Sequence, residues 1–296
     1  MAAGARVASF ALLVALAFGA AALAGSEVDP GVEASPHDEK LAHVQEEDEM
    51  QTHETGTEVP GLAVAEGGLR LILDQTRVEP SAHAPISFRI VDGGGATVED
   101  FDTEHERRMH LIVVRRDFSG FQHLHPVQQA DGSWRARLDS RLPGAYRAFA
   151  DFASDGASLT LGGDLFVPGA FEPVPLEKPA AIADAGDAYE VSVESGELRA
   201  GESAALRFRV SRGGRELPGV EPYLGADGHL VALREGDLGF LHTHPEGEPG
   251  GSGPIRFQVS YPSEGRYRIF LQFRHDGEVR TAAFTQVAGP HQEGER

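Results

Sequence analysis

The sequence predicts an all-β protein built from two tandem antiparallel β-sandwich domains of immunoglobulin-like or cupredoxin-like type. From residue 61 onward, apolar residues alternate with a period of two, in short runs broken by Gly, Pro and Asp. This is the pattern of half-buried strands, and about seven such runs in about 110 residues are typical of a sandwich domain. The pattern occurs twice, because HLIVVRRDFSGFQHLHP at 110–126 returns as HLVALREGDLGFLHTHP at 229–245.

Residues 1–24 have the composition of a signal peptide. A single basic residue, Arg6, precedes the apolar run VASFALLVALAFGAAALA, which ends in small residues at Ala22 and Ala24. We expect cleavage after Ala24, with retention as an uncleaved membrane anchor as the alternative. Either outcome predicts an exported protein that is periplasmic, extracellular or tethered to the membrane.

Charge and proline content divide the rest of the chain. Residues 26–59 contain eleven acidic residues and one Lys, with almost no large apolar side chain, so 25–60 is predicted to be a disordered acidic tether. Four prolines within 168–179 predict a stiff, extended linker. The remaining predicted boundaries are a first sandwich repeat at 61–168, a Pro-rich linker at 169–180, a second repeat at 181–288 and a tail at 289–296.

The predicted strands of the two repeats match in order and in apolar pattern. The alternating apolar sets are Leu69, Leu71 and Leu73, then Ile86, Phe88 and Ile90 in the first repeat, and Val191 and Val193, then Leu206, Phe208 and Val210 in the second. Late in each repeat, Tyr146, Phe149 and Phe152 recur as Tyr267, Phe270 and Phe273. A Tyr shortly after a Gly at the start of a late strand is reminiscent of a tyrosine corner, which favours the immunoglobulin-like type.

Three histidines are the most conspicuous part of the repeat. His110, His123 and His125 return as His229, His242 and His244, each at an offset of 119 positions. Imidazole is the commonest protein metal ligand, and a His-x-His pair on a strand points both rings to one face. The sequence therefore predicts a metal site in each repeat, formed by these six residues. Histidines that only stabilise the hairpin structurally are the alternative.

The hairpin geometry permits the three rings to meet. A four-residue loop would pair Arg116 with Phe121, and would place His123 opposite Val114 and His125 opposite Ile112. His110 then shares their face, and a register shift of two residues keeps all three on that face. The residues Glu104, His105, Met109, Asp227 and Glu246 lie near the histidines in sequence, but none of them is repeated, so none is a strong candidate for a fourth ligand.

Composition restricts the metal and the partners. The formal charge of −20, from 46 acidic and 26 basic residues, repels phosphate backbones and removes nucleic acid from the expected partners. The chain has no Cys and only three Met, which excludes thiolate sites and disfavours a cuprous site. Imidazole, carboxylate and water ligands favour a divalent transition metal, Cu²⁺ or Zn²⁺.

The two His-containing stretches and RYRIFLQFRHDGEVRTAAF at 266–284 resemble a group of exported bacterial proteins described as hypothetical or heavy-metal-binding. This resemblance covers nearly all of residues 61–288. More distantly, the predicted sandwich is similar to periplasmic copper-handling domains of the CopC and YtkA-like kind. The chain departs from the copper-resistance pattern, because it lacks methionine clusters and a His near the mature N-terminus.

The sequence thus predicts an exported, non-enzymatic metal-binding protein that holds Cu²⁺ or Zn²⁺ at a three-His site in each repeat. Its partners would be metal ions, and binding should weaken below about pH 6 as the imidazoles become protonated. The alternative is an envelope protein–protein interaction module whose histidines are structural. The metal, the fourth ligand, a protein partner and the oligomeric state are open at this stage.

Overall fold

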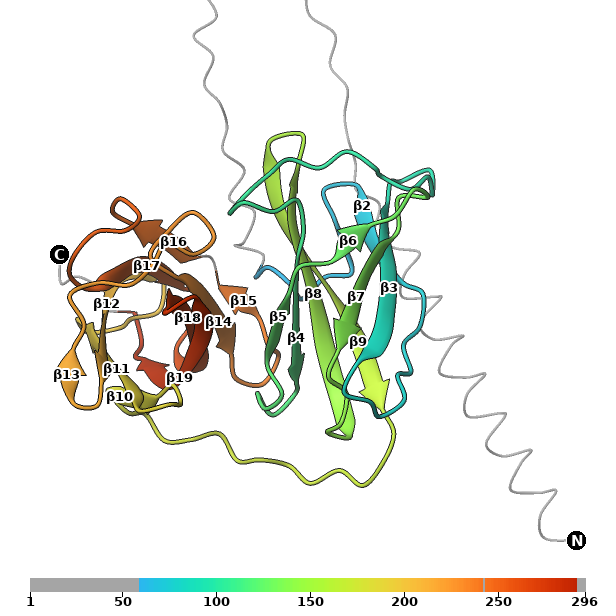
Figure 1. The fold of residues 1–296 in the computed structure, drawn as a ribbon. Coiled ribbons are helices and arrows are strands. Elements are labelled where there is room, and N and C mark those ends of the chain that lie inside the picture. The colour runs from blue at the N-terminus through green and yellow to red at the C-terminus, as the bar shows by residue number, and fades with distance from the viewer. Residues whose placement is uncertain (1–58, 242, 292–296) are drawn as a thin grey trace, which may run out of the picture. The chain divides into compact units, whose positions relative to one another are not determined.

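The computed structural model describes residues 59–241 and 243–291 (Figure 1). The predicted signal peptide, the predicted tether up to residue 58, His242 and residues 292–296 lie outside the described residues. Both repeats belong to one compact unit. Within the described part of the chain, no helix is long and apolar enough to cross a membrane.

The first repeat is a sandwich of two antiparallel sheets. One sheet has the order β1-β2-β3-β7-β6, with β1 at Ala65–Glu66, β2 at Leu69–Leu73, β3 at Ala84–Val91, β7 at Trp134–Leu138 and β6 at Val127–Gln128. The other has the order β5-β4-β8-β9, with β5 at Gln122–Leu124, β4 at His110–Arg115, β8 at Gly144–Ser154 and β9 at Ala157–Val167.

The second repeat has the same plan. Its first sheet has the order β10-β11-β12-β17-β16, with β10 at Ile182–Asp184, β11 at Tyr189–Ser195, β12 at Glu202–Arg212, β17 at Ile255–Tyr261, β16 at Thr243–Glu246, and β13 at Arg215–Glu216 beside β12. Its second sheet has the order β15-β14-β18-β19, with β15 at Phe240–Leu241, β14 at His229–Arg234, β18 at Gly265–His275 and β19 at Glu278–Ala288. The prediction of two immunoglobulin-like sandwiches is confirmed.

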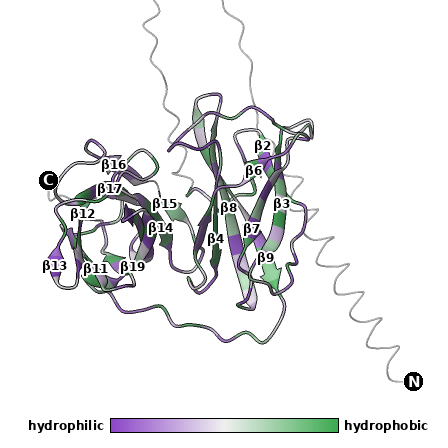
Figure 2. Cartoon of the chain, in the orientation of Figure 1, coloured by the Kyte–Doolittle hydropathy of each residue, from purple (hydrophilic) through white to green (hydrophobic). Residues whose placement is uncertain are grey.

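Each sandwich has its own apolar core, formed by the inward positions of alternating strands. Figure 2 shows the alternation as hydrophobic and hydrophilic colour along the strands, with β13 hydrophilic. Both tyrosine corners are present. The hydroxyl of Tyr146 donates to the carbonyl of Leu142 at 2.7 Å, and that of Tyr267 to the carbonyl of Ser263 at 2.7 Å. These bonds fix the approach to β8 and β18, two strands of 11 residues each.

The predicted pairing of the histidine hairpin was wrong by two residues. Ile112, and not Val114, pairs with His123. The cause is a tighter turn, in which the backbone N–H of Arg115 donates to the carbonyl of Ser119. The Asp117 carboxylate stabilises this turn by accepting hydrogen bonds from the Arg115 side chain and from Ser119. The second hairpin has the equivalent register, with Ala232 opposite Leu241. A shift of two residues preserves the face of every side chain, so the three histidines still share one side.

A third apolar cluster lies between the two repeats and joins β4 and β8 of one to β14, β15 and β18 of the other. Its aromatic contacts come as an equivalent pair. Phe121 stacks on Phe270 with ring centroids 3.9 Å apart, and Phe240, the counterpart of Phe121, contacts Phe149, the counterpart of Phe270, at 5.6 Å. The same faces of the two repeats therefore meet each other.

The segment before β1 is held at this contact. The carbonyl of Pro60 accepts a hydrogen bond from the backbone of Phe240, and the carbonyl of Gly61 accepts two from the Arg147 guanidinium. Gly61 has a φ of +75°, and a Cβ added there would lie 2.6 Å from the Phe149 ring. The position therefore requires glycine for both conformation and space.

We expect Gly61→Ala to destabilise the protein by about 2–3 kcal/mol, the sum of a positive-φ cost and of overpacking. Urea unfolding followed by tryptophan fluorescence measures the change. Gly68→Ala is the matched control, because Gly68 has a φ of +79° but open space around it. Equal losses in the two variants would contradict the packing argument.

Candidate metal centre

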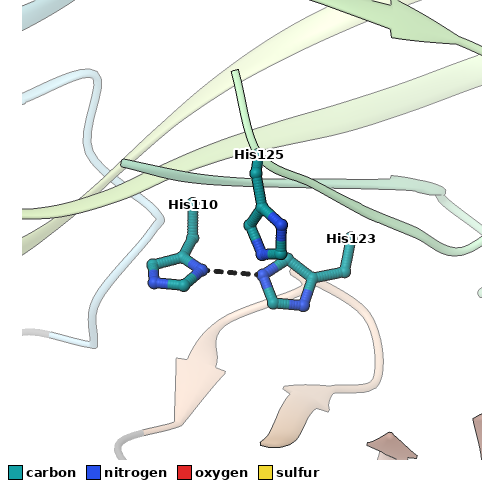
Figure 3. Close-up of side chains that lie close together, drawn as sticks. All are labelled: His110, His123 and His125. Atoms are coloured by element: carbon teal, nitrogen blue, oxygen red, sulfur yellow. Dashed lines mark hydrogen bonds between the residues drawn. The ribbon is translucent and has the colours of Figure 1, made fainter. Parts of the chain in front are cut away.

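His110, His123 and His125 come together at the end of the β4–β5 hairpin, as Figure 3 shows. Each ring offers one nitrogen to a group whose members all lie within 4.8 Å of one another, and among the described residues this is the single such group of three His, Asp or Glu side chains. His110 is 2% exposed. The Nε2 atom of His125 is buried and has no hydrogen-bond partner. The first half of the predicted site is therefore assembled as a three-His cluster that could hold a metal ion.

The outer nitrogens of two rings face fixed acceptors. His110 Nε2 lies 3.3 Å from the carbonyl of Glu104, and His123 Nδ1 lies 2.7 Å from Oε1 of Gln272, which belongs to the second repeat. The inner nitrogens, His110 Nδ1 and His123 Nε2, face each other at 2.9 Å. Gln272 is oriented by its own amide, which donates to the Thr281 hydroxyl at 3.4 Å.

Protons are too few for this arrangement. The three contacts in the chain from Glu104 through the two rings to Gln272 each need one hydrogen, while two neutral imidazoles carry two. If both outer nitrogens donate to their oxygen acceptors, the two inner nitrogens present only lone pairs to each other. A cation between the inner nitrogens resolves the conflict, since metal-bound imidazoles commonly donate their other N–H to a carbonyl or amide oxygen.

Burial keeps these rings neutral. It lowers the pKa of His110 to about 3, with a further contribution from the neighbouring His123 ring, and it lowers the pKa of His123 to about 4. The pKa of His125 is also lowered, by burial and then by Arg107. Neutral imidazoles are the form that binds metal, so no proton competes for the site at neutral pH.

The second set of histidines is arranged differently from the first. The His229 ring stacks on the rings of His123 and His110, at centroid distances of 4.5 Å and 5.5 Å, so this member of the second set meets the first set at the contact between the repeats. Burial and these neighbours hold the pKa of His229 well below its usual range. His244 is exposed and lines a cavity beside His229. His242 lies outside the described residues, so the predicted second site is not tested as a whole.

Two residues beside the histidines, Gln272 and Asp151, were missed from the sequence, and a third, His105, was considered there but not favoured. The His105 ring lies 5.8 Å from His229 and 6.1 Å from His110 by centroid distance. Gln272 and Asp151 occupy the same repeat position, at an offset of 121, and each pairs across strands with the first histidine of its own repeat. Their shared position in the repeat is the sequence signal that could have identified Gln272 and Asp151. Burial raises the pKa of Asp151 to about 6, and the nearby Glu104 adds to the shift.

The other residues near the histidines in sequence serve elsewhere. Met109 is buried in the first core, and Asp227 accepts a hydrogen bond from the backbone of Gly250. Of the histidines without a counterpart in the other repeat, His83 is exposed, whereas His275 contacts the Tyr189 hydroxyl at 2.8 Å. None of these four belongs to the three-His cluster.

The family model described as Domain of unknown function (DUF8832) matches residues 63–167 and again residues 183–289. The same domain is therefore present twice, and the chain belongs to this family. No curated protein matches the sequence.

Among solved structures, the chain is similar to the Escherichia coli adhesin FdeC, at 14% identity and a TM-score of 0.26, over 78% of this chain and 66% of that one. It is also similar to InvD of Yersinia pseudotuberculosis, at 14% identity and a TM-score of 0.25, over 77% of this chain and 59% of that one. A further match is to domains 4 and 5 of the S-layer protein SbsC, at 10% identity and a TM-score of 0.23, over 77% and 98%. The chain spans about two thirds or less of the two first-named proteins. Values this low say nothing about the chemistry of the histidines.

Proposed function

We propose that the protein is an exported, non-enzymatic metal-binding protein that holds a divalent transition metal, Cu²⁺ or Zn²⁺, at His110, His123 and His125. The three rings supply neutral nitrogen donors, and the bound metal supplies a fixed positive charge between them. No thiolate or methionine-rich alternative exists in a chain without Cys and with three Met. An all-imidazole set fits cupric and zinc ions.

The observation that carries the proposal is the shortage of one proton among the three contacts that His110 and His123 make with each other and with their oxygen acceptors. Their inner nitrogens stand 2.9 Å apart while both outer nitrogens face oxygen acceptors. In a tetrahedral zinc site the nitrogens of two ligands lie roughly 3.3 Å apart. A small outward rotation of the rings reaches that spacing, and the unpartnered Nε2 of His125 supplies the third donor.

Export is supported by the sequence of residues 1–24, and the resemblance to exported heavy-metal-binding proteins fits this place. The acidic segment 25–60 would raise the local concentration of cations near the site. Scavenging or buffering a metal outside the cytoplasm requires no catalytic group, and the proposal assigns none.

The test is metal binding to residues 59–291 by calorimetry after removal of metal with a chelator. One equivalent of Cu²⁺ or Zn²⁺ is expected to bind tightly at the three-His cluster, and the double variant His123→Ala/His125→Ala should lose it. His83→Ala is the control, because His83 is exposed and is not a member of the cluster. Electron paramagnetic resonance of the Cu²⁺ form should show nitrogen hyperfine structure. Tight binding that survives the double variant would overturn the ligand assignment.

The second candidate is an envelope protein–protein interaction module whose histidines are structural. Its support is the hydrogen bond from His123 to Gln272 and the stacking of His229 on His123, which link the two repeats without any ion. On this hypothesis the double variant would be strongly destabilised even without metal, and no metal would change the stability of the native protein.

A further inference from the structure

A cavity of about 330 Å³ lies beside the three-His cluster, at the contact between the repeats. Its wall contains five side chains able to bind a cation. They are Glu104, His105 and Asp151 from the first repeat, and His229 and His244 from the second. None of them belongs to the group formed by His110, His123 and His125.

The two repeats differ at positions that line this cavity. At three repeat positions the first repeat has an ionisable residue in the cavity wall where the second repeat has a neutral residue. Asp151 corresponds to Gln272, His105 to Leu224, and Glu104 to Tyr223. The turns at Glu104–Arg107 and Tyr223–Ala226 make the same isolated bridge, which confirms the correspondence.

Each carboxylate in the cavity is anchored through one oxygen. Thr160 donates to Oδ1 of Asp151 at 2.7 Å, and Ser158 donates to Oε1 of Glu104 at 2.8 Å. Within the described part of the chain, the second oxygen of each side chain accepts no hydrogen bond from another residue, and the ring nitrogens of His229 and His244 make none. Fixed carboxylates with a free oxygen, next to neutral imidazoles, are a donor set for a cation.

We propose that this cavity is a second cation site, which binds a partly hydrated divalent cation through Asp151 and Glu104 with imidazole ligands from His229, His244 and His105. The site does not depend on metal binding at the three-His cluster. Its donor atoms stand farther apart than the 4.8 Å grouping of that cluster, so water completes the shell inside the 330 Å³ volume. Carboxylate and water ligands suit Mn²⁺ better than an all-imidazole site does. The three-His cluster and this cavity therefore favour different ions.

The experiment is a titration of metal-free residues 59–291 with Mn²⁺ at physiological salt, with free Mn²⁺ measured by electron paramagnetic resonance. One bound Mn²⁺ per chain is expected. Asp151→Gln, which copies the residue of the other repeat, should weaken binding at least tenfold. Asp155→Asn is the matched control: it removes the same charge four residues along, in an exposed turn, and should change the affinity less than twofold.

His244→Ala tests the site from the second repeat, and because His244 is exposed this variant leaves the fold intact. It should also weaken Mn²⁺ binding, whereas His125→Ala, which removes a ligand of the three-His cluster but not the ring on which His229 stacks, should leave it unchanged. The proposal is overturned if the native protein binds no Mn²⁺, if Asp151→Gln and His244→Ala both bind it normally, or if binding is lost in His125→Ala instead. The last result would place the ion in the three-His cluster, and the Cu²⁺ and Zn²⁺ titrations above would still decide that cluster's own function.

Discussion

Saturating the metal-free protein with Zn²⁺ or Cu²⁺ is expected to raise its melting temperature by roughly 5–10 °C. An ion that binds only the folded state at 100 times its dissociation constant stabilises by about 2.7 kcal/mol. For a chain of this size each kcal/mol corresponds to about 2–4 °C. The gain arises because the ion binds the inner nitrogens of His110 and His123, which lie 2.9 Å apart, only in the folded state. Differential scanning calorimetry with and without the ion measures it.

The same scan contains its own control. A chelator should return the melting temperature to the metal-free value, and His83→Ala should respond to metal as the native protein does. In His123→Ala/His125→Ala the shift should vanish. If the native protein shows no shift with any divalent ion, the histidines are structural and the interaction-module hypothesis replaces the proposed function.

Lowering the pH from 6.5 to 4.5 is expected to cost the metal-free protein on the order of 4 kcal/mol of unfolding free energy. The pKa values of His110 and His123 are about 3 and about 4 in the folded state, against about 6.5 in the unfolded chain. Between pH 6.5 and 4.5 these two histidines become protonated in the unfolded chain but stay largely neutral in the folded protein. Each ring then contributes a slope of about 1.4 kcal/mol per pH unit, with stability falling as pH falls.

Asp151 opposes this trend. Its pKa of about 6 lies above the unfolded value of about 3.9, so the folded state binds the extra proton and gains stability as pH falls from 6 to 4. The protonation of this one carboxyl offsets only part of the effect of the histidine rings, so the unfolding free energy still falls as the pH falls. Urea unfolding at several pH values in the presence of a chelator measures the slope. It should be shallower in the His123 and His125 variant, and a flat profile in the native protein would contradict the burial argument.

The same pKa values correct one expectation drawn from the sequence. Free imidazoles near pH 6.5 would lose metal below about pH 6. In the folded protein, protons compete for His110 and His123 only near pH 3 to 4, so metal binding should persist to lower pH until acid unfolding removes the site. Burial of the ligands therefore widens the range over which the site is expected to work.

The alternation of apolar residues along the sequence was sufficient to predict the fold class. Alternation with a period of two identified the strands, and Tyr146 and Tyr267 correctly indicated the corner typical of immunoglobulin-like domains. The hairpin register was missed by two residues because the turn closes between Arg115 and Ser119 and is stabilised by hydrogen bonds to Asp117, which the hydrophobic pattern does not encode. The grouping of His110, His123 and His125 survived that error, since parity alone places the rings on one face.

The rest of the site depends on contacts between distant parts of the chain. Gln272 lies 149 positions from His123, and no spacing rule connects them. His105 was set aside because it has no repeated counterpart, although its ring lies against His110 and His229. The sequence predicted two separate domains, each with a metal site of its own. The packing of Phe121 on Phe270 and of Phe240 on Phe149 brings the repeats together, and His229 of the second set lies against His110 and His123 there.

That reciprocal aromatic packing has an evolutionary consequence. Two copies of one domain that meet through the same face form an isologous contact, the kind that a symmetric homodimer uses. In a homodimer every substitution appears on both sides, so its two halves must stay identical. Joining the copies in one chain keeps them together at any dilution and frees each half to mutate alone. The exchange of Gln272 for Asp151 is a divergence that only the fused form permits.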